Sequence, residues 1–466
     1  MHGRFAAGEI GAAAVVAAVV AWAAWRRSVA EVIAAGLVVG VVTRRRWFAV
    51  VVVLLGLGAT MRAVDARHDV APDELGAFAG WATVVDDPRP AAGAIRVILQ
   101  IDGERFEVWV RGRASRMRVE RWRGGDAVWV LGERTALRPE RIDRVAWQHI
   151  VGEFVADSLG DRRDGRPLAV ASNRVRSLVA RATGMLPDDD AALARGLIIG
   201  DDTDQPSDML ERFRASGLAH LTAVSGQNVN FVMAAAGPLL RRLRPTPRLA
   251  ASLALIGWFV VVTRAEPSVL RAGAMAALGT VAFAFGRERE PPRLLAVAVT
   301  GLLLVDPLLV MSVGFWLSVG ATAGVTVLSS PLAARLRFTG PLAVPLAVTL
   351  AAQIGVAVPS LLVFGRLSLV GVVANLGAVP IAGFVMLYGL PACLAAGVLP
   401  LVDPVLMAPV GVGVRAVDTI AWAAARAEPP VAVSVAAWVM IAVVLVVLLV
   451  RPVRIGLPDS DPQLSQ

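Results

Sequence analysis

Two long apolar blocks separated by a polar stretch constrain this chain more than any other feature of its sequence. The first block covers Met1–Thr60 and the second roughly Leu218–Val450, while most of the Asp and Glu residues lie between them, in Arg62–Arg214. Hydrophobic residues make up 56% of the 466 positions, against about 45–50% in soluble globular domains. The surplus and its division into blocks predict a polytopic α-helical membrane protein.

Arginine clusters divide the blocks into segments that are long enough to cross a bilayer as helices, and we expect about 10–12 spans. The candidate spans are Ala6–Trp25, Val29–Thr43, Trp47–Met61, Leu218–Leu240, Leu249–Thr263, Val269–Phe285, Leu294–Val305, Val310–Leu328, Leu342–Val363, Ile381–Leu399 and Val431–Val450. A further segment, Val405–Ala427, carries Arg415, Asp418 and Arg426. It is read either as a span or as a surface helix.

The positions of the arginines predict which loops face the cytoplasm, because short cytoplasmic loops are enriched in arginine. Arg44–Arg46 are therefore expected inside, which places the polar stretch after Arg62 outside. The clusters Arg241–Arg248, Arg287–Arg293 and Arg335–Arg337 occupy every second loop of the second block and fall inside as well. This bias is the favoured explanation of the net charge of +9, and attraction to a polyanion is the alternative.

The polar stretch is predicted to form an extracytoplasmic β domain. Short runs rich in Val, Ile, Trp and Phe are separated by turn residues: Trp81–Val85, Ala94–Ile101, Arg105–Arg111 and Asp126–Leu131. Phe106, Val108 and Val110 recur with the period of two that is typical of a strand. Several short strands in close succession favour a small OB-like β-barrel. We expect Trp81 and Phe106 in its core.

An amphipathic helical linker is predicted after the β domain. Apolar residues recur at helical spacing within Ser172–Gly200, a second helix starts at Pro187-Asp188, and Gly200 ends it. The expected organisation is N-terminal transmembrane helices (1–62), the OB-like domain (63–165), the linker (166–212), a second transmembrane domain (213–452) and a polar tail (453–466).

Four segments, in order, carry a family resemblance. They are "FRASGLAHLTAVSGQNVNFV" (Phe213–Val232), "PSVLRAGAM" (Pro267–Met275), "DPLLVMSVGFWLSVGAT" (Asp306–Thr322) and "VPSLLVFGRLSLVGVVANLGAVP" (Val358–Pro380). They resemble the motifs of the bacterial ComEC-type DNA-internalisation family. The sequence departs from the family pattern at Asn228, where many members have His, at Gln227, and at Trp316, where many have Gln. A titrating imidazole at position 228 is therefore not expected.

The resemblance implies a multi-pass protein of the bacterial plasma membrane that imports single-stranded DNA during natural transformation. It also implies partners: a DNA-receptor protein outside, a cytoplasmic helicase-like motor and a separate nuclease, with membrane lipid around the helices and a possible homo-oligomer. Two alternatives remain open. The chain could transport another anionic substrate, or it could be a truncated relative with a structural role.

The sequence gives no sign of an enzyme. Full-length relatives end in a metallo-β-lactamase-like domain, which needs clustered His and Asp to hold a metal. The four histidines here, His2, His68, His149 and His220, are scattered, and no Gly-x4-Gly-Lys-Ser/Thr motif is present. We expect no catalytic residues, no metal site, no cofactor and no ATP hydrolysis.

Polar groups at membrane depth are costly and often line a pathway. The candidates for channel-lining or motif roles are His220, Ser225, Gly226, Asn228, Arg271, Phe315, Ser318, Gln353, Asn375 and Pro380. We also expect Gly217, Gly314, Gly320, Pro359, Gly365 and Gly371 to interrupt apolar helices. The alternative is that the polar side chains join neighbouring helices by hydrogen bonds. A lone histidine such as His220 is more often a packing residue.

Arginines supply the candidate contacts with a polyanion. Arg271 is expected either to contact phosphate or to form a salt bridge with Glu266 or Asp306. In the β region, the candidates for DNA contact are Arg111, Arg113, Arg116, Arg118, Arg121 and Arg123, interspersed with tryptophans as in single-strand-binding surfaces. The alternative for this run is an ordinary solvated basic face.

Overall fold

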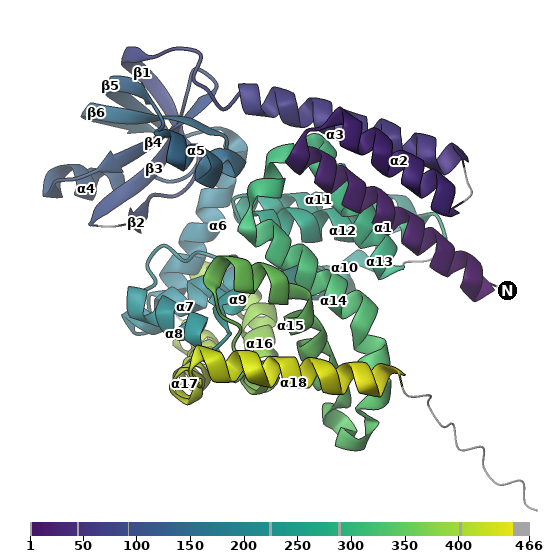
Figure 1. Ribbon diagram of the computed structural model, residues 1–466. Helices are drawn as coiled ribbons and strands as arrows, with labels where there is room; N and C mark the ends of the chain where they lie inside the picture. The colour runs from purple at the N-terminus through teal and green to yellow at the C-terminus, as the bar shows by residue number, and fades with distance from the viewer. Residues whose placement is uncertain are drawn as a thin grey trace, which may run out of the picture.

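A computed structural model describes residues 2–43, 46–91, 93–222, 226–287, 290–399 and 403–450. The chain is mostly helical, and one β domain lies at an end of the helical part (Figure 1). Three N-terminal helices, α1 (His2–Arg26), α2 (Val29–Thr43) and α3 (Arg46–His68), pack side by side, and α3 leads into the β domain. Their bounds agree closely with the apolar segments expected from the sequence.

The β domain contains a six-stranded sheet within the described residues. Its strands are β1 (Gly76–Val84), β2 (Arg89–Ala91), β3 (Ala94–Ile101), β4 (Glu104–Val110), β5 (Ala127–Ala136) and β6 (Ile150–Arg163), with the short helices α4 (Arg113–Val119), α5 (Pro139–Val145) and η1 (Ala146–Gln148) between them. The order is β1-β5-β6-β4-β3-β2, and β1 pairs additionally with β3. Only β4 and β6 run parallel among these described pairs. Phe106, Trp122 and Phe154 fill the core.

Two expectations for the β domain were wrong. Trp81 is 37% exposed, because Ala82 and Val84 occupy the inward positions of β1 and Trp81 points outward against Trp129. The long strand β6 was missed, because many of its side chains are exposed and polar, which weakens the apolar alternation that identifies a strand. Phe106 is buried as expected.

Three helices form the linker, α6 (Pro167–Thr183), α7 (Asp188–Ile199) and α8 (Ser207–Ala215). The predicted start at Asp188 and the predicted end at Gly200 are confirmed. In Figure 1, α6 descends from the β domain towards α7 and α8. The linker packs onto the second apolar region through a common core that includes Leu197, Phe213 and Val385.

The second apolar region follows. Its elements are α9 (Ala219–Thr222), α10 (Gly226–Leu240), α11 (Pro245–Val262), α12 (Pro267–Ala284), α13 (Pro291–Val305), η2 (Pro307–Met311), α14 (Val313–Arg335), η3 (Arg337–Leu342), α15 (Ala343–Phe364), α16 (Gly371–Val398), α17 (Asp403–Ala427) and α18 (Val431–Val450). Among the described residues, seven helices are long and apolar enough to cross a membrane, and several apolar helices are shorter. One of the seven is α17. Its charged residues pair with the linker, Arg415 with Asp190 at 2.7 Å and Asp418 with Arg212 at 2.9 Å.

The expected span Leu218–Leu240 is helical on both sides of residues 223–225, which lie outside the described residues. Helix α13 ends beside the β domain, where Asp306 contacts His149, and the α11–α12 turn contacts it through Arg264 and Asp87. Helix α12 begins and α13 ends beside the β domain, so Arg287, which follows α12, lies at the far end of these two helices. The charge pattern predicts arginine at that end.

Several glycines and prolines that were expected to interrupt helices lie inside them instead. Gly314 and Gly320 are within α14, and Pro359 and Pro380 are within α15 and α16. The reason is packing: α14 and α15 approach so closely that a Cβ on Gly320 would lie 2.4 Å from the carbonyl oxygen of Gly355. Small residues permit this kind of helix contact in membranes.

We expect Gly320→Ala to destabilise the protein by about 1–3 kcal/mol, because the added methyl group overpacks a backbone contact. Thermal unfolding of detergent-solubilised protein, followed by tryptophan fluorescence, measures the effect. The matched control is Gly301→Ala on α13, where an added Cβ meets no atom within 4 Å. Equal midpoints for the two variants would contradict the close contact between α14 and α15.

Candidate functional site

Arg271 is a buried arginine on α12. Its side chain is only 6% exposed. Its Nε donates to Oγ of Ser318 on α14 at 2.8 Å, and its Nη1 lies 3.2 Å from Sδ of Met275. Within the part of the chain that the structure describes, no Asp or Glu forms an ion pair with it. A buried charge without a counter-charge is costly, so this arginine requires an explanation.

The first residue of α10, Gly226, lies directly against the Arg271 guanidinium. A Cβ at this position would be 2.5 Å from Nη2 of Arg271, so only glycine allows the approach. The positive charge here is that of the guanidinium itself, which Gly226 and Ser318 contact. Arg271, Ser318 and Gly226 therefore form a positive site, which we call the Arg271 site. Its chemistry is that of anion binding.

Neither salt bridge proposed for Arg271 forms. Glu266 pairs instead with Arg89 of the β domain at 3.1 Å, and Asp306 contacts Nε2 of His149 at 3.0 Å. Both carboxylates are thus taken by residues from the β domain, which the sequence alone did not place beside the helices. Arg271 retains hydrogen-bond partners but no counter-ion among the described residues.

Two further lining candidates, Asn228 and Asn375, form hydrogen bonds with backbone carbonyls. Asn228 is buried and its Nδ2 donates to the carbonyl oxygen of Leu197 at 3.1 Å. Asn375 is buried on α16, and its Nδ2 donates to Gly371 O of the same helix at 2.6 Å. The Asn228 amide thus joins α10 to α7, as expected of a helix-joining side chain, whereas the Asn375 amide bonds within its own helix.

The other candidates lie in varied surroundings. Phe315 is fully buried, one turn before Ser318 on α14, in the core shared with the N-terminal helices. Gln353 is half-buried on α15, His220 is exposed on α9 and Pro380 is exposed within α16. Ser225 lies outside the described residues. A lining role for these residues stays a prediction.

A buried cluster of charged residues joins the β domain to the helices. We call it the inter-domain ion cluster: Asp86, Asp87, Arg89, Arg176, Asp201, Asp202, Arg264 and Glu266. Asp87, in the β1–β2 loop, is central to it. Its carboxylate accepts hydrogen bonds from Arg264 and from the backbone N–H of Gly124, each at 2.8 Å, and pairs with Arg176 at 2.8 Å. Arg176 reaches on to Asp201 at 3.0 Å.

Arg89 forms the second half of the cluster. Its guanidinium faces Glu266 at 3.1 Å, Asp202 at 3.6 Å and Asp86 at 3.7 Å. Four separate parts of the chain therefore meet here: the β1–β2 loop, α6, the α7–α8 loop and the α11–α12 turn. In that turn, Arg264 and Ala265 both have left-handed backbone angles, φ 58° and 53°. Such angles are strained for residues other than glycine. The ion pair between Arg264 and Asp87 stabilises the turn in this conformation.

The electrostatics favour a charged Asp87. Burial alone would raise its pKa, but the guanidinium groups of Arg176 and Arg264 outweigh burial and lower the pKa to about 2. By contrast, burial raises the pKa of Asp86, despite the neighbouring Arg89. Sequence reasoning missed this cluster, because "DDPR" and "GDD" were interpreted as local turn and helix-end signals.

Glu428 was also missed. Its carboxylate accepts hydrogen bonds from the backbone N–H groups of Leu369 and Val370, both at 3.0 Å, just before α16. It also accepts from the hydroxyls of Ser368 and Ser434, at 2.8 Å and 2.9 Å. The carboxylate thereby ties the start of α16 to the α17–α18 turn. The sequence did contain a signal for this contact, because Glu428 is an acidic residue between two apolar segments.

The six arginines proposed for DNA contact lie before, on and after α4. Within the described residues none of the six forms an ion pair; Arg118 donates to Leu159 O, and Arg123 donates to two nearby carbonyl oxygens at 3.1 Å. Arg111, Arg113 and Arg121 are exposed. The run is therefore a surface of uncompensated positive charge, as a polyanion-binding surface requires. Its ligand is not identified by this geometry.

Comparison with known proteins gives a family match. The model of the family described as "Competence protein" matches residues 197–454, which is more than half of the chain. The matched region begins in α7 and includes the Arg271 site and all helices from α8 onward. No solved structure matches the chain.

Two curated proteins are similar to parts of the chain. "ComE operon protein 3" of Bacillus subtilis (strain 168) is 29% identical over 218 residues, which are 46% of this chain and 27% of that protein. "Uncharacterized protein YcaI" of Escherichia coli (strain K12) is 25% identical over 249 residues, 51% of this chain and 33% of that protein. The match thus spans a third or less of each relative's length.

The ion cluster predicts a loss of stability for Asp87→Asn. The pKa of Asp87 is below its ordinary value of 3.8, so its stabilising effect is present above pH 3.8 and is lost as the pH falls towards 2. The difference corresponds to about 2 kcal/mol at neutral pH. We expect a lower unfolding midpoint at pH 7 for the variant, and a smaller difference from wild type as the pH approaches 2.

The control is Asp157→Asn, an exposed acid on β6 of the same domain. Its midpoint should equal that of the wild type. The prediction is wrong if Asp87→Asn and Asp157→Asn unfold at the same temperature at pH 7, because the two arginines would then not depend on the Asp87 charge.

Proposed function

This chain belongs to the competence protein family, and we propose that it is a channel through which single-stranded DNA crosses the bacterial plasma membrane during natural transformation. The family match and the apolar helices make it a multi-pass membrane protein. The similarity to "ComE operon protein 3" supports a role in DNA uptake. Because the match covers only part of that relative, the activity, the substrate and the bacterial plasma membrane as its location belong to the proposal.

The single observation that carries the proposal is the Arg271 site. A strand of DNA is a polyanion and can cross hydrocarbon only along a path with polar or cationic walls. Arg271 is buried at the junction of three helices that bear family motifs, and within the described residues no carboxylate satisfies it. An arginine left without a counter-ion in such a place suits a phosphate that passes through.

The β domain supports the same proposal. The pairing of β1 with both β5 and β3 returns the sheet to its first strand, and we propose that the domain is an OB-like barrel. The arginine run from Arg111 to Arg123 on one side of it would guide the strand by its phosphates. In this scheme a DNA-receptor protein delivers DNA outside, and a helicase-like motor and a separate nuclease act with the channel.

We expect Arg271→Ala to slow DNA entry into proteoliposomes at least about tenfold, the effect of losing about 1.4 kcal/mol at one charge-assisted contact. The assay follows a fluorescent oligonucleotide that becomes protected from external nuclease under a membrane potential. Arg271→Lys keeps the charge but not the planar fork, so its rate should lie between those of the wild type and Arg271→Ala.

The control is Arg242→Ala, an exposed arginine in the segment between α10 and α11, which should leave the rate unchanged. Unfolding midpoints check that all variants are folded. Equal rates for Arg271→Ala and the wild type would contradict the proposal. If reconstituted protein carries inorganic phosphate but no oligonucleotide, the chain is a transporter of a smaller anion instead.

A further inference from the structure

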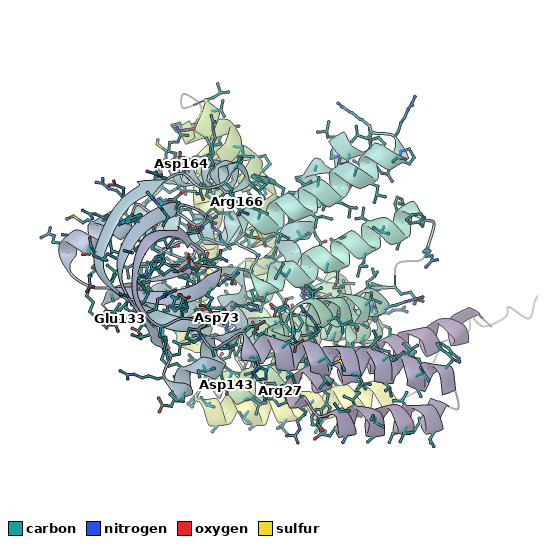
Figure 2. All side chains as sticks on the ribbon, turned by 90° about the horizontal axis from the view of Figure 1, so that it is seen from above. Arg27, Asp73, Glu133, Asp143, Asp164 and Arg166 are labelled. Atoms are coloured by element: carbon teal, nitrogen blue, oxygen red, sulfur yellow. The ribbon has the colours of Figure 1, made fainter. Side chains whose placement is uncertain are left out.

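A cleft of about 430 Å³ opens between the β domain and α6, separate from the Arg271 site. Arg121 and Arg123 line one wall, Arg162 projects from the end of β6, and Arg174 lines the opposite wall on α6. Figure 2 labels Asp164 and Arg166, which mark the place where the sheet passes into the helices. Asp164 belongs to the cleft lining. The cleft therefore combines cations from the β domain and from the linker.

The charges in the cleft are unbalanced. Arg162 is taken by Asp126 at 3.3 Å and Asp164 at 3.7 Å. Arg121 and Arg174 are exposed and, within the described residues, neither forms an ion pair or a hydrogen bond through its side chain. Arg123 donates only to backbone carbonyls. The lining holds four arginines and three carboxylates (Glu120, Asp126 and Asp164), so the arginines exceed the carboxylates by one.

We propose that this cleft binds the phosphodiester backbone of single-stranded DNA and passes the strand from the β domain towards the membrane helices. The inference rests on the proposed function and adds a binding site to it. Arg121 and Arg123 hold phosphates from the β-domain side, and Arg174 holds them from α6. Guanidinium groups suit this task, because each presents several donors to phosphate oxygens.

Two features favour a single strand as the ligand. The volume is in the range of pockets that hold one small molecule, comparable with one nucleotide, so a duplex does not fit. The cleft also continues the arginine run of α4, which carries unpaired charge along the route that a strand would follow. Asn173, which lines the cleft, donates to Gly124 O and accepts from Arg264, and so connects the cleft to the inter-domain ion cluster.

The outer face of the sheet is a poorer site, although it displays aromatic residues. Trp81 and Trp129 pack edge to face there, with Arg163 4.1 Å from the centre of the Trp81 ring. However, the exposed neighbours include Glu133 on β5 and Asp157 on β6, which would repel a polyanion. Phosphate binding is therefore assigned to the cleft and not to this aromatic face.

The first test measures binding of a fluorescein-labelled oligothymidylate to the full chain in phosphatidylcholine nanodiscs. The cleft variant Arg121→Ala/Arg174→Ala removes one arginine from each wall. For single strands, each lost phosphate contact lowers the slope of log Kd against log salt concentration by about 0.7. The loss of two contacts should therefore raise Kd about 25-fold at 0.1 M salt. The matched control, Arg138→Ala/Arg144→Ala, removes two exposed arginines near α5 and should leave Kd and slope unchanged.

The results that overturn the proposal are clear. Equal Kd values and slopes for the two double variants would show that only net charge matters. A wild-type protein that does not bind the oligonucleotide also overturns it. The same holds for a cleft variant that keeps oligonucleotide binding but, in parallel nanodiscs that contain phosphatidylglycerol, loses that lipid, since the cleft would then hold lipid headgroups. None of these outcomes alters the flux measured for Arg271 variants, so the two proposals fail separately.

A second test places the strand in the cleft directly. Cys393 is the only cysteine and is fully buried, so Ser177→Cys introduces the accessible thiol, on α6 in the cleft lining. A benzophenone attached there should crosslink to the bound oligonucleotide. The control is Ser158→Cys, which lies on β6 opposite Leu131. Crosslinking that is equal at the two positions, or stronger at 158, would remove the cleft as the binding site.

Discussion

The inter-domain ion cluster is the interaction on which the rest of the structure depends. The side chains of Asp87, Arg176 and Arg264 are at most 11% exposed, and ions withdrawn from water to this extent are costly unless they are paired. Removal of one member leaves the others without compensation. Because its members come from four parts of the chain, the cluster fixes the β domain against the helices. Helix α12, which carries Arg271, begins immediately after Glu266 of this cluster, so the position of the proposed phosphate site depends on it.

The described arginines fall into two groups, those that pair with a carboxylate and those that do not. The second group is the one expected to bind an anion. Arg176 and Arg264 are each matched to Asp87 at 2.8 Å and serve as fixed structural bonds. Arg271 has a hydroxyl and a sulfur as neighbours and no carboxylate among the described residues. The basic cleft repeats the contrast near the surface, where Arg162 is paired and Arg174 is not. In each place, the unpaired member is the one able to accept a passing anion.

Much of the fold could be predicted from local sequence patterns. The contacts between distant segments could not. The Val- and Ile-rich run Ala94–Ile101 predicted β3 without error, since strand composition is a property of a few neighbouring residues. Asp87 and Arg264 are 177 positions apart, and no periodic signal reports that kind of pairing. For the same reason the sequence placed Arg271 among the candidates but assigned its partners incorrectly. Gly320 was read as a helix breaker, because the close approach of α15 is visible only in three dimensions.

The position of Arg264 has a consequence for how the protein is made. Arginine is disfavoured in loops that leave the cytoplasm, and the α11–α12 turn carries Arg264 to the same end of the helices as the β domain. When this turn is synthesised, Asp87 and Arg176 have already been translated. A hairpin inserted in the correct orientation brings Arg264 to Asp87. An inverted hairpin leaves Asp87 without this partner. The ion cluster therefore links the orientation of the α11–α12 hairpin to the position of the β domain, because Asp87 and Arg264 pair only when both lie at the same end of the helices.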